Sequence, residues 1–364
     1  MTATTLSLRP LGTGELLDRA VRLYRRHFLT FIGIIAIVQV PLVLLQMGFS
    51  LLSIQWWAEP ASLTEAAALA GSFGQLLVTI LGYLLVSSLG TAALTRAIAN
   101  SYLGQPVSLV GAYRQIGKSW LVLVLALLLI FLLGILLSLW WLIPCIGWFT
   151  GLGMLLYLSL VISPLTAPTV VLEKQRARAA VRRAWDLSRR RFWPVVGFVT
   201  VLFIFNMIFT VTPSLLVGFF LGLGMDPLTA SFTDQQMIST VVSSLITLVF
   251  SLIFLPFQLT AMTLLYFDLR IRTEGFDLAL LARSVDLPVP QKEGLAGELA
   301  LSMEPAAAAD LTESIAEAPA PEREPLITGA ELGYFLAITL TLGVFYFALV
   351  FGITFLAMAA TGGM

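Results

Sequence analysis

Residues 120–142 read WLVLVLALLLIFLLGILLSLWWL and contain no charged side chain. A membrane span needs about 20 consecutive, mostly apolar residues, so this stretch is long enough to cross a bilayer as one helix. Because lipid offers no hydrogen-bond partners, a spanning segment must satisfy its own backbone, as an α-helix does. The stretch therefore predicts an integral membrane protein.

Six further segments outward from this stretch meet the same requirement: 28–54, 73–94, 148–172, 193–223, 238–267 and 334–360. The composition of the whole chain agrees, since 58% of its 364 residues are hydrophobic and 12% are charged. Soluble chains have about 45–50% apolar and about 25% charged residues. We predict an all-α integral membrane protein with seven spans.

The orientation follows from the positions of Lys and Arg. They precede the first span and follow the second, fourth and sixth, whereas the alternate loops 55–72, 143–147 and 224–237 contain none. Loops rich in Lys and Arg stay in the cytoplasm. We therefore expect a multi-pass protein of the cell membrane with a cytoplasmic N-terminus and, after seven spans, an external C-terminus.

An internal repeat accompanies this charge pattern. The motif RAxxLxRRxFxxxxG occurs at 19–33 and again at 183–197, and a weaker copy lies near 108–120. Each copy has the pattern of a basic amphipathic helix that leads into a pair of spans. We predict a six-span core of three parallel repeats, each an interfacial amphipathic helix plus two spans. The alternative is that any basic helix before a span looks alike.

The last part of the chain differs in composition. Residues 284–328 are rich in Ala, Pro and Glu, which predicts a flexible segment because too little apolar area is available for burial. We expect a membrane core at 1–283, a cytoplasmic linker at 284–330 and a tethered seventh span within 331–364.

Three stretches resemble the glycerophosphoryl diester phosphodiesterase membrane-domain family: RPLGTGELLDRAVRLYRR at 9–26, AWDLS at 184–188 with RFW at 191–193, and LYFDLR at 265–270 followed by EGFDL at 274–278. The resemblance covers about residues 9–281 and implies a stand-alone membrane domain of six spans, from which the seventh span departs. Some members of the family are fused to a phosphodiesterase barrel that supplies His, Glu, Asp and a divalent metal. No segment here is long and polar enough for that barrel, so the resemblance implies no such activity.

The residue types needed for catalysis are scarce. The chain has one histidine, His27, and one cysteine, Cys145, and its formal net charge is zero. A lone histidine lacks the partners that catalytic and metal-binding histidines need. We expect no enzyme activity, no cofactor, no metal site and no nucleic-acid partner.

Two groups of residues are candidates for binding. Arginines beneath the bilayer are expected to contact anionic lipid headgroups: Arg25, Arg26, Arg182, Arg183, Arg189, Arg190 and Arg191. Uncharged polar residues also occur within spans, among them Gln46 and Gln75, and three are candidates for a polar intramembrane cavity: Gln39, Asn206 and Gln258. The alternatives are that the arginines anchor the topology and that the amides bond between helices.

Three functions remain open from the sequence. The preferred one is a non-enzymatic protein of the cell envelope that binds lipid or a membrane or cytoplasmic protein partner. The second is a permease for a neutral or lipidic solute. The third is the membrane subunit of an enzyme whose catalytic part is a separate chain.

Overall fold

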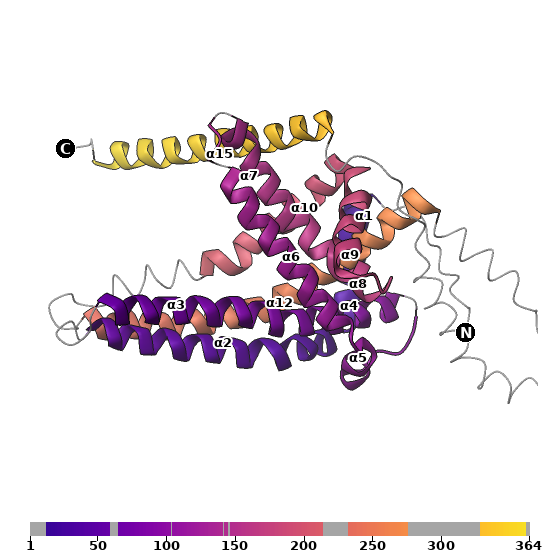
Figure 1. The fold of residues 1–364 in the computed structure, drawn as a ribbon, viewed down its shortest axis with the longest axis horizontal. Helices are drawn as coiled ribbons and strands as arrows, with labels where there is room; N and C mark the ends of the chain where they lie inside the picture. Colours follow the sequence, from indigo (N-terminus) through magenta and orange to yellow (C-terminus); the bar gives the residue numbers. More distant parts are fainter. Residues whose placement is uncertain are drawn as a thin grey trace, which may run out of the picture.

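The computed structural model describes residues 12–58, 65–102, 104–140, 142–144, 146–213, 232–275 and 328–361, and all regular structure in these ranges is helical (Figure 1). Six helices are long and apolar enough to cross a membrane: Phe28–Ile54, Gly71–Tyr102, Ser119–Trp140, Ile146–Val171, Phe192–Phe209 and Asp234–Glu274. The prediction of an all-α fold is confirmed for the described residues, and the six long apolar helices agree with the predicted membrane protein. Residues 214–223 of the predicted fifth span, and nearly all of the predicted linker, lie outside the described residues.

The spanning helices follow one another as pairs. The first pair is α2 (Phe28–Ala58) and a long rod made of α3 (Glu65–Gly82), the π-helical η1 (Tyr83–Ser87) and α4 (Ser88–Tyr102). The second pair is α6 (Ser119–Trp140) and the rod of α7 (Ile146–Tyr157), η2 (Leu158–Ile162) and α8 (Ser163–Val171). The third joins α10 (Phe192–Asn206) and η3 (Met207–Val211) to α12 (Phe232–Glu274).

Three shorter helices precede these pairs: α1 (Thr13–Arg26), α5 (Leu109–Ile116) and α9 (Ala177–Arg189). Each is amphipathic, as the sequence predicts, and buries a narrow apolar face, which in α1 includes Leu16, Ala20 and Tyr24. The Tyr24 hydroxyl donates to the backbone oxygen of Ile253 at 2.8 Å, and burial raises the pKa of Tyr24 to about 12. Tyr24 therefore stays a hydrogen-bond donor that ties α1 to α12.

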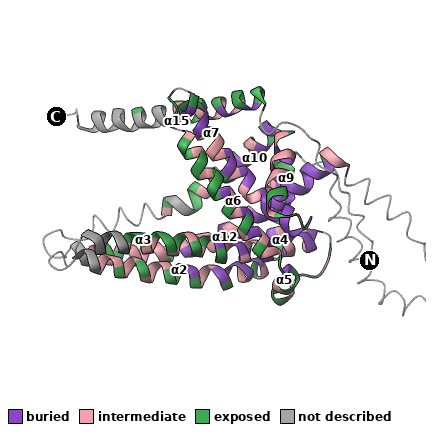
Figure 2. Ribbon diagram, viewed as in Figure 1, coloured by how far each residue is buried: buried purple, intermediate pink, exposed green. Residues whose placement is uncertain are grey.

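The buried residues gather at one end of the molecule, where α1, α4, α8, α9 and residues 259–274 of α12 meet (Figure 2). We call this the basic end. From it α2 and α3, with α12 beside them, run in one direction, while α6 and α7 diverge in another (Figure 1). Away from the basic end these helices expose large apolar side chains such as Leu76, Leu125 and Leu136, which suits contact with lipid.

The seventh predicted span is the 33-residue helix α15 (Gly329–Thr361), which crosses α7 (Figure 1). The backbone N–H of Gly153 donates to Thr339 Oγ1 at 3.0 Å. A Cβ atom on Gly153 would collide with the backbone of Phe335. The ring of Phe335 is itself buried among Tyr157, Trp185 and Phe192. The start of α15 is thus docked on the core, whereas its crossing of a membrane stays a prediction.

The close approach at Gly153 gives a test of this docking. The substitution Gly153→Val should displace the Phe335 backbone and destabilise the protein by about 1–3 kcal/mol, the usual cost of overpacking. The measurement is the unfolding temperature of the purified chain in detergent micelles. Gly197→Val on α10 is the matched control, since its Cβ would meet nothing within 4 Å. Equal unfolding temperatures for the two variants would contradict the docking.

Candidate functional site

A cluster of buried charges lies at the centre of the basic end. Glu173 follows α8, and its side chain has no exposed surface. The Tyr266 hydroxyl donates to Glu173 Oε1 at 2.6 Å, and Arg183 Nε donates to Glu173 Oε2 at 3.1 Å. Lys174, with φ of 52°, adopts the left-handed conformation where the chain turns from α8 into α9.

Two further residues of α12 complete the cluster. Arg270, 2% exposed, donates from Nη1 to the Tyr266 hydroxyl at 3.2 Å and from Nε to Glu274 Oε2 at 3.0 Å. Glu274 also forms an ion pair with Arg183. Two carboxylates therefore balance two guanidinium groups. Buried charges are tolerated only when they are paired and hydrogen-bonded in this way.

Two of the predicted lipid contacts are engaged in ion pairs within the protein. Arg183 is bound inward by Glu173 and Glu274. The Arg189 side chain is 7% exposed and lies 3.5 Å from Asp186 and 3.7 Å from Glu331 at the start of α15. Both arginines hold the protein together, so contact with lipid headgroups has to come from other cations.

The remaining arginines are more accessible. Arg182 lies 3.9 Å from Asp186, and its side chain is 41% exposed. Burial raises the pKa of Asp186, against the opposing effect of Arg189 and Arg182. Of the other four, Arg191 is half-buried, and three are exposed: Arg25, Arg26 and Arg190. These four and Arg182 remain candidates for headgroup contacts.

Sequence reasoning missed Glu173, although a signal was present. Glu173 is the only acidic residue between Glu65 and Asp186, and it directly follows an apolar span. An isolated acid beside a span calls for a cationic partner. The cluster is an ion-pair network, because each of its carboxylates faces a guanidinium group. Among the described residues no group of three or more His, Cys, Asp or Glu could hold a metal ion.

Removal of the central carboxylate tests the cluster. Glu173→Gln leaves two guanidinium groups facing one acid, and loss of one partner of a buried pair costs about 3–5 kcal/mol. We expect a large drop in the unfolding temperature in detergent. The control is Asp18→Asn in the exposed Asp18–Arg22 pair, because exposed pairs contribute only about 0–1 kcal/mol. A small effect at Glu173 would mean that the cluster is not structural.

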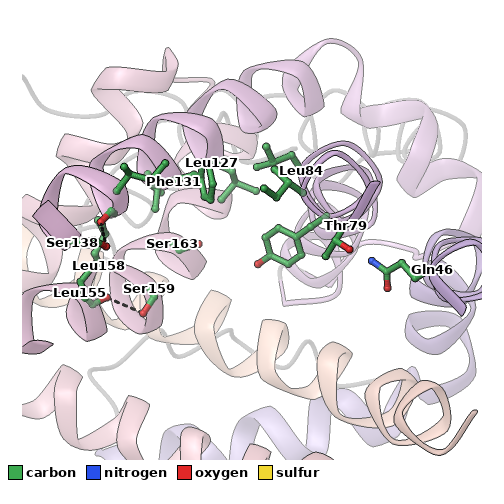
Figure 3. A pocket seen from close by; sticks show the side chains of 15 residues that line it. Gln46, Thr79, Leu84, Leu127, Phe131, Ser138, Leu155, Leu158, Ser159 and Ser163 are labelled. Carbon is green, nitrogen blue, oxygen red and sulfur yellow. Dashed lines mark hydrogen bonds between the residues drawn. The ribbon is translucent and has the colours of Figure 1, made fainter. Parts of the chain in front are cut away.

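Where α3 and α6 diverge, the helices line an open cavity of about 540 Å³, which we call the wide cavity. Figure 3 shows Gln46, Thr79 and Leu84 on one side of it and Phe131, Leu155 and Ser159 on the other. Most of its lining is apolar. The hydroxyls of Ser138 and Ser159 donate to the backbone of their own helices, at 2.9 and 2.8 Å.

A second cavity, of about 280 Å³, lies among α2, α3 and α12, and we call it the polar cavity. It shares Gln46 and Thr79 with the wide cavity, so the two adjoin. It is lined by Val43, Gln46, Met47, Ser50, Gln75, Thr79, Ser243, Ser244 and Thr247. The described residues that line the two cavities include no charged side chain. The two adjoining cavities thus offer one apolar and one polar lining, both uncharged.

The three residues predicted to line a polar cavity lie elsewhere. Gln39 on α2, Asn206 on α10 and Gln258 on α12 are each half-buried, and none lines the wide or the polar cavity. Two other glutamines, Gln46 and Gln75, line the polar cavity instead.

Six long apolar helices among the described residues indicate a multi-pass helical membrane protein. Residues 104–269 match the model of a domain of unknown function (DUF7847), which makes this part of the chain similar to that family. The matched region contains Glu173, Arg183 and Tyr266, together with the α6–α8 wall of the wide cavity. No curated protein and no solved structure matches the chain.

Proposed function

We propose that this chain is a non-enzymatic, multi-pass protein of the cell envelope that binds a lipid between its first two helix pairs. The observation that carries the proposal is the polar cavity beside the wide, largely apolar cavity, with Gln46 and Thr79 lining both. A polar pocket beside an apolar space matches the two parts of an amphipathic lipid. Ligand sites commonly combine mostly apolar walls with a few convergent polar groups.

The topology belongs to the same proposal. With Lys and Arg kept inside, the basic end faces the cytoplasm, and the cavities lie toward the outer leaflet. The accessible arginines would then contact anionic headgroups of the inner leaflet: Arg25, Arg26, Arg182, Arg190 and Arg191.

We also propose that the core consists of three parallel repeats. Each of α1, α5 and α9 is followed by a short break and then by the first helix of a pair. In the first two copies a π-helical turn, η1 or η2, is followed by a Thr-Ala pair: Thr91-Ala92 and Thr166-Ala167. These recurrences, and the resemblance to the glycerophosphoryl diester phosphodiesterase membrane domain, support a shared structural unit.

A second candidate function is a permease for a neutral or lipidic solute. α12 lines the polar cavity with three hydroxyl side chains, Ser243, Ser244 and Thr247. They favour this function, since a solute path within a helical bundle needs polar groups. Uptake of a neutral solute into liposomes that contain the protein would distinguish the permease from a binding protein.

The topology can be tested with a reporter enzyme that is active only outside the cytoplasm. Fused after Met364, the reporter should be active, because seven spans place that end outside. Fused at Pro305, in the predicted cytoplasmic linker, it should be silent. The reverse pattern would overturn the orientation, and silence at both positions would mean that α15 does not cross the membrane.

Lipid binding can be tested by filling the wide cavity. Gly134 lines it, and a Cβ atom there would meet nothing within 4 Å, so Gly134→Phe should occupy space without disturbing the fold. We expect the variant to retain severalfold less lipid than the native chain when purified in mild detergent, as measured by mass spectrometry. Gly197→Phe on α10 is the matched control, because its side chain also enters open space but lies outside the cavity. Equal lipid content in the two variants would contradict the proposal.

A further inference from the structure

The polar cavity is unusual in the chemistry of its lining. Seven of its nine lining residues carry a hydroxyl or an amide: Gln46, Ser50, Gln75, Thr79, Ser243, Ser244 and Thr247. Two of these hydroxyls already donate a hydrogen bond within their own helix. Thr79 Oγ1 donates to the backbone oxygen of Gln75 at 2.8 Å, and Ser243 Oγ donates to the backbone oxygen of Thr240 at 3.2 Å. Their lone pairs remain available, so these groups face a ligand as hydrogen-bond acceptors.

One acceptor lacks a partner. The Oε1 atom of Gln75 is buried and receives no hydrogen bond from any described residue. A buried amide oxygen without a donor is costly, and native proteins rarely keep one. Gln75 lines the polar cavity, so a ligand that donates a hydrogen bond there would satisfy it.

The surroundings of the cavity disfavour a charged ligand. The sequence has no Lys or Arg between Arg26 and Arg96, or between Arg191 and Arg270, so the walls that α2, α3 and α12 supply contain no cation. A phosphate group moved from water into such a site would lose its hydration and gain no opposite charge. A phosphodiester also has no proton to donate to Gln75.

The depth of the cavity indicates the part of a lipid that it would hold. At 1.5 Å per residue, Gln46 lies about 27 Å along α2 from Phe28, close to the full hydrocarbon thickness of about 30 Å. The polar cavity therefore lies near the membrane boundary opposite the basic end. Tyr83 and Leu84 of the wide cavity lie further along the same rod toward the basic end, at the depth of acyl chains.

From these observations we infer that the polar cavity binds the head group of an outer-leaflet lipid whose head is uncharged and bears hydroxyl groups, with its acyl chain in the wide cavity. The inference rests on the proposed lipid binding and specifies its ligand class. Glycosylated diacylglycerols and diacylglycerol itself share this chemistry, while anionic and zwitterionic phospholipids lack it.

The test measures binding of three probes with identical acyl chains to the full-length protein in nanodiscs: a monoglycosyl diacylglycerol, diacylglycerol and phosphatidylglycerol. We expect the two uncharged lipids to bind at least tenfold more tightly than phosphatidylglycerol, and binding of each to be lost in Gly134→Phe. If the glycosylated probe binds more tightly than diacylglycerol, the sugar occupies the polar cavity; if the two bind equally, the glycerol hydroxyl does.

Two variants then locate the head group. Gln75→Leu should weaken binding of the uncharged lipids about tenfold, while Gln39→Leu, on the same helix pair but outside both cavities, should leave it within about twofold. Ser244→Ala is a milder second variant, to be used if Gln75→Leu does not fold. It should weaken binding of the uncharged lipids severalfold.

The outcomes separate the two proposals. Phosphatidylglycerol binding as tightly as the uncharged lipids, and lost in Gly134→Phe, would overturn the head-group inference but leave lipid binding intact. Equal effects of Gln75→Leu and Gln39→Leu would likewise overturn the inference. Binding that is indifferent to Gly134→Phe, or absent for all three probes, would overturn the proposed function itself.

Discussion

The ion-pair network of Glu173, Arg183, Arg270 and Glu274, completed by Tyr266, is the constraint on which the arrangement of helices depends. In a bilayer, packing one apolar helix on another gains little from the hydrophobic effect, because lipid tails are equally apolar. Specific polar contacts therefore decide which helices meet. Here those contacts join α8, α9 and α12 at the basic end, and the buried apolar residues gather around them.

The first two helix pairs diverge from the basic end (Figure 1). Among the described residues the tightest packing lies near the network, while α2, α3 and α6 present apolar surface to the surroundings further away (Figure 2). Helices joined at one end and separated at the other leave space between them. The wide cavity occupies the space between the first two helix pairs, and the polar cavity adjoins it among α2, α3 and α12.

Sequence reasoning predicted the elements better than their contacts. Apolar length identified the spanning helices, and amphipathic periodicity identified α1 and α9, since both signals are local. The inner face of α2 could not be predicted, because that helix is apolar on all sides, so Gln39 and Gln46 were equivalent candidates until the neighbouring helices were placed. Arg183 was likewise assigned to lipid because its acidic partners, Glu173 and Glu274, lie far away in the sequence.

The arrangement of the helices also bears on the choice between the two proposed functions, a lipid-binding protein and a permease. A permease must open its site alternately to both sides of the membrane. The basic end is closed, since Thr95, Thr166 and Thr260 have no exposed surface and the ion pairs of Glu173 and Glu274 are buried as well. Breaking those ion pairs would leave Arg183 and Arg270 without their carboxylates in a buried setting, at a cost of several kcal/mol. The closed basic end therefore supports the proposal that the protein holds a lipid over the proposal that it transports one.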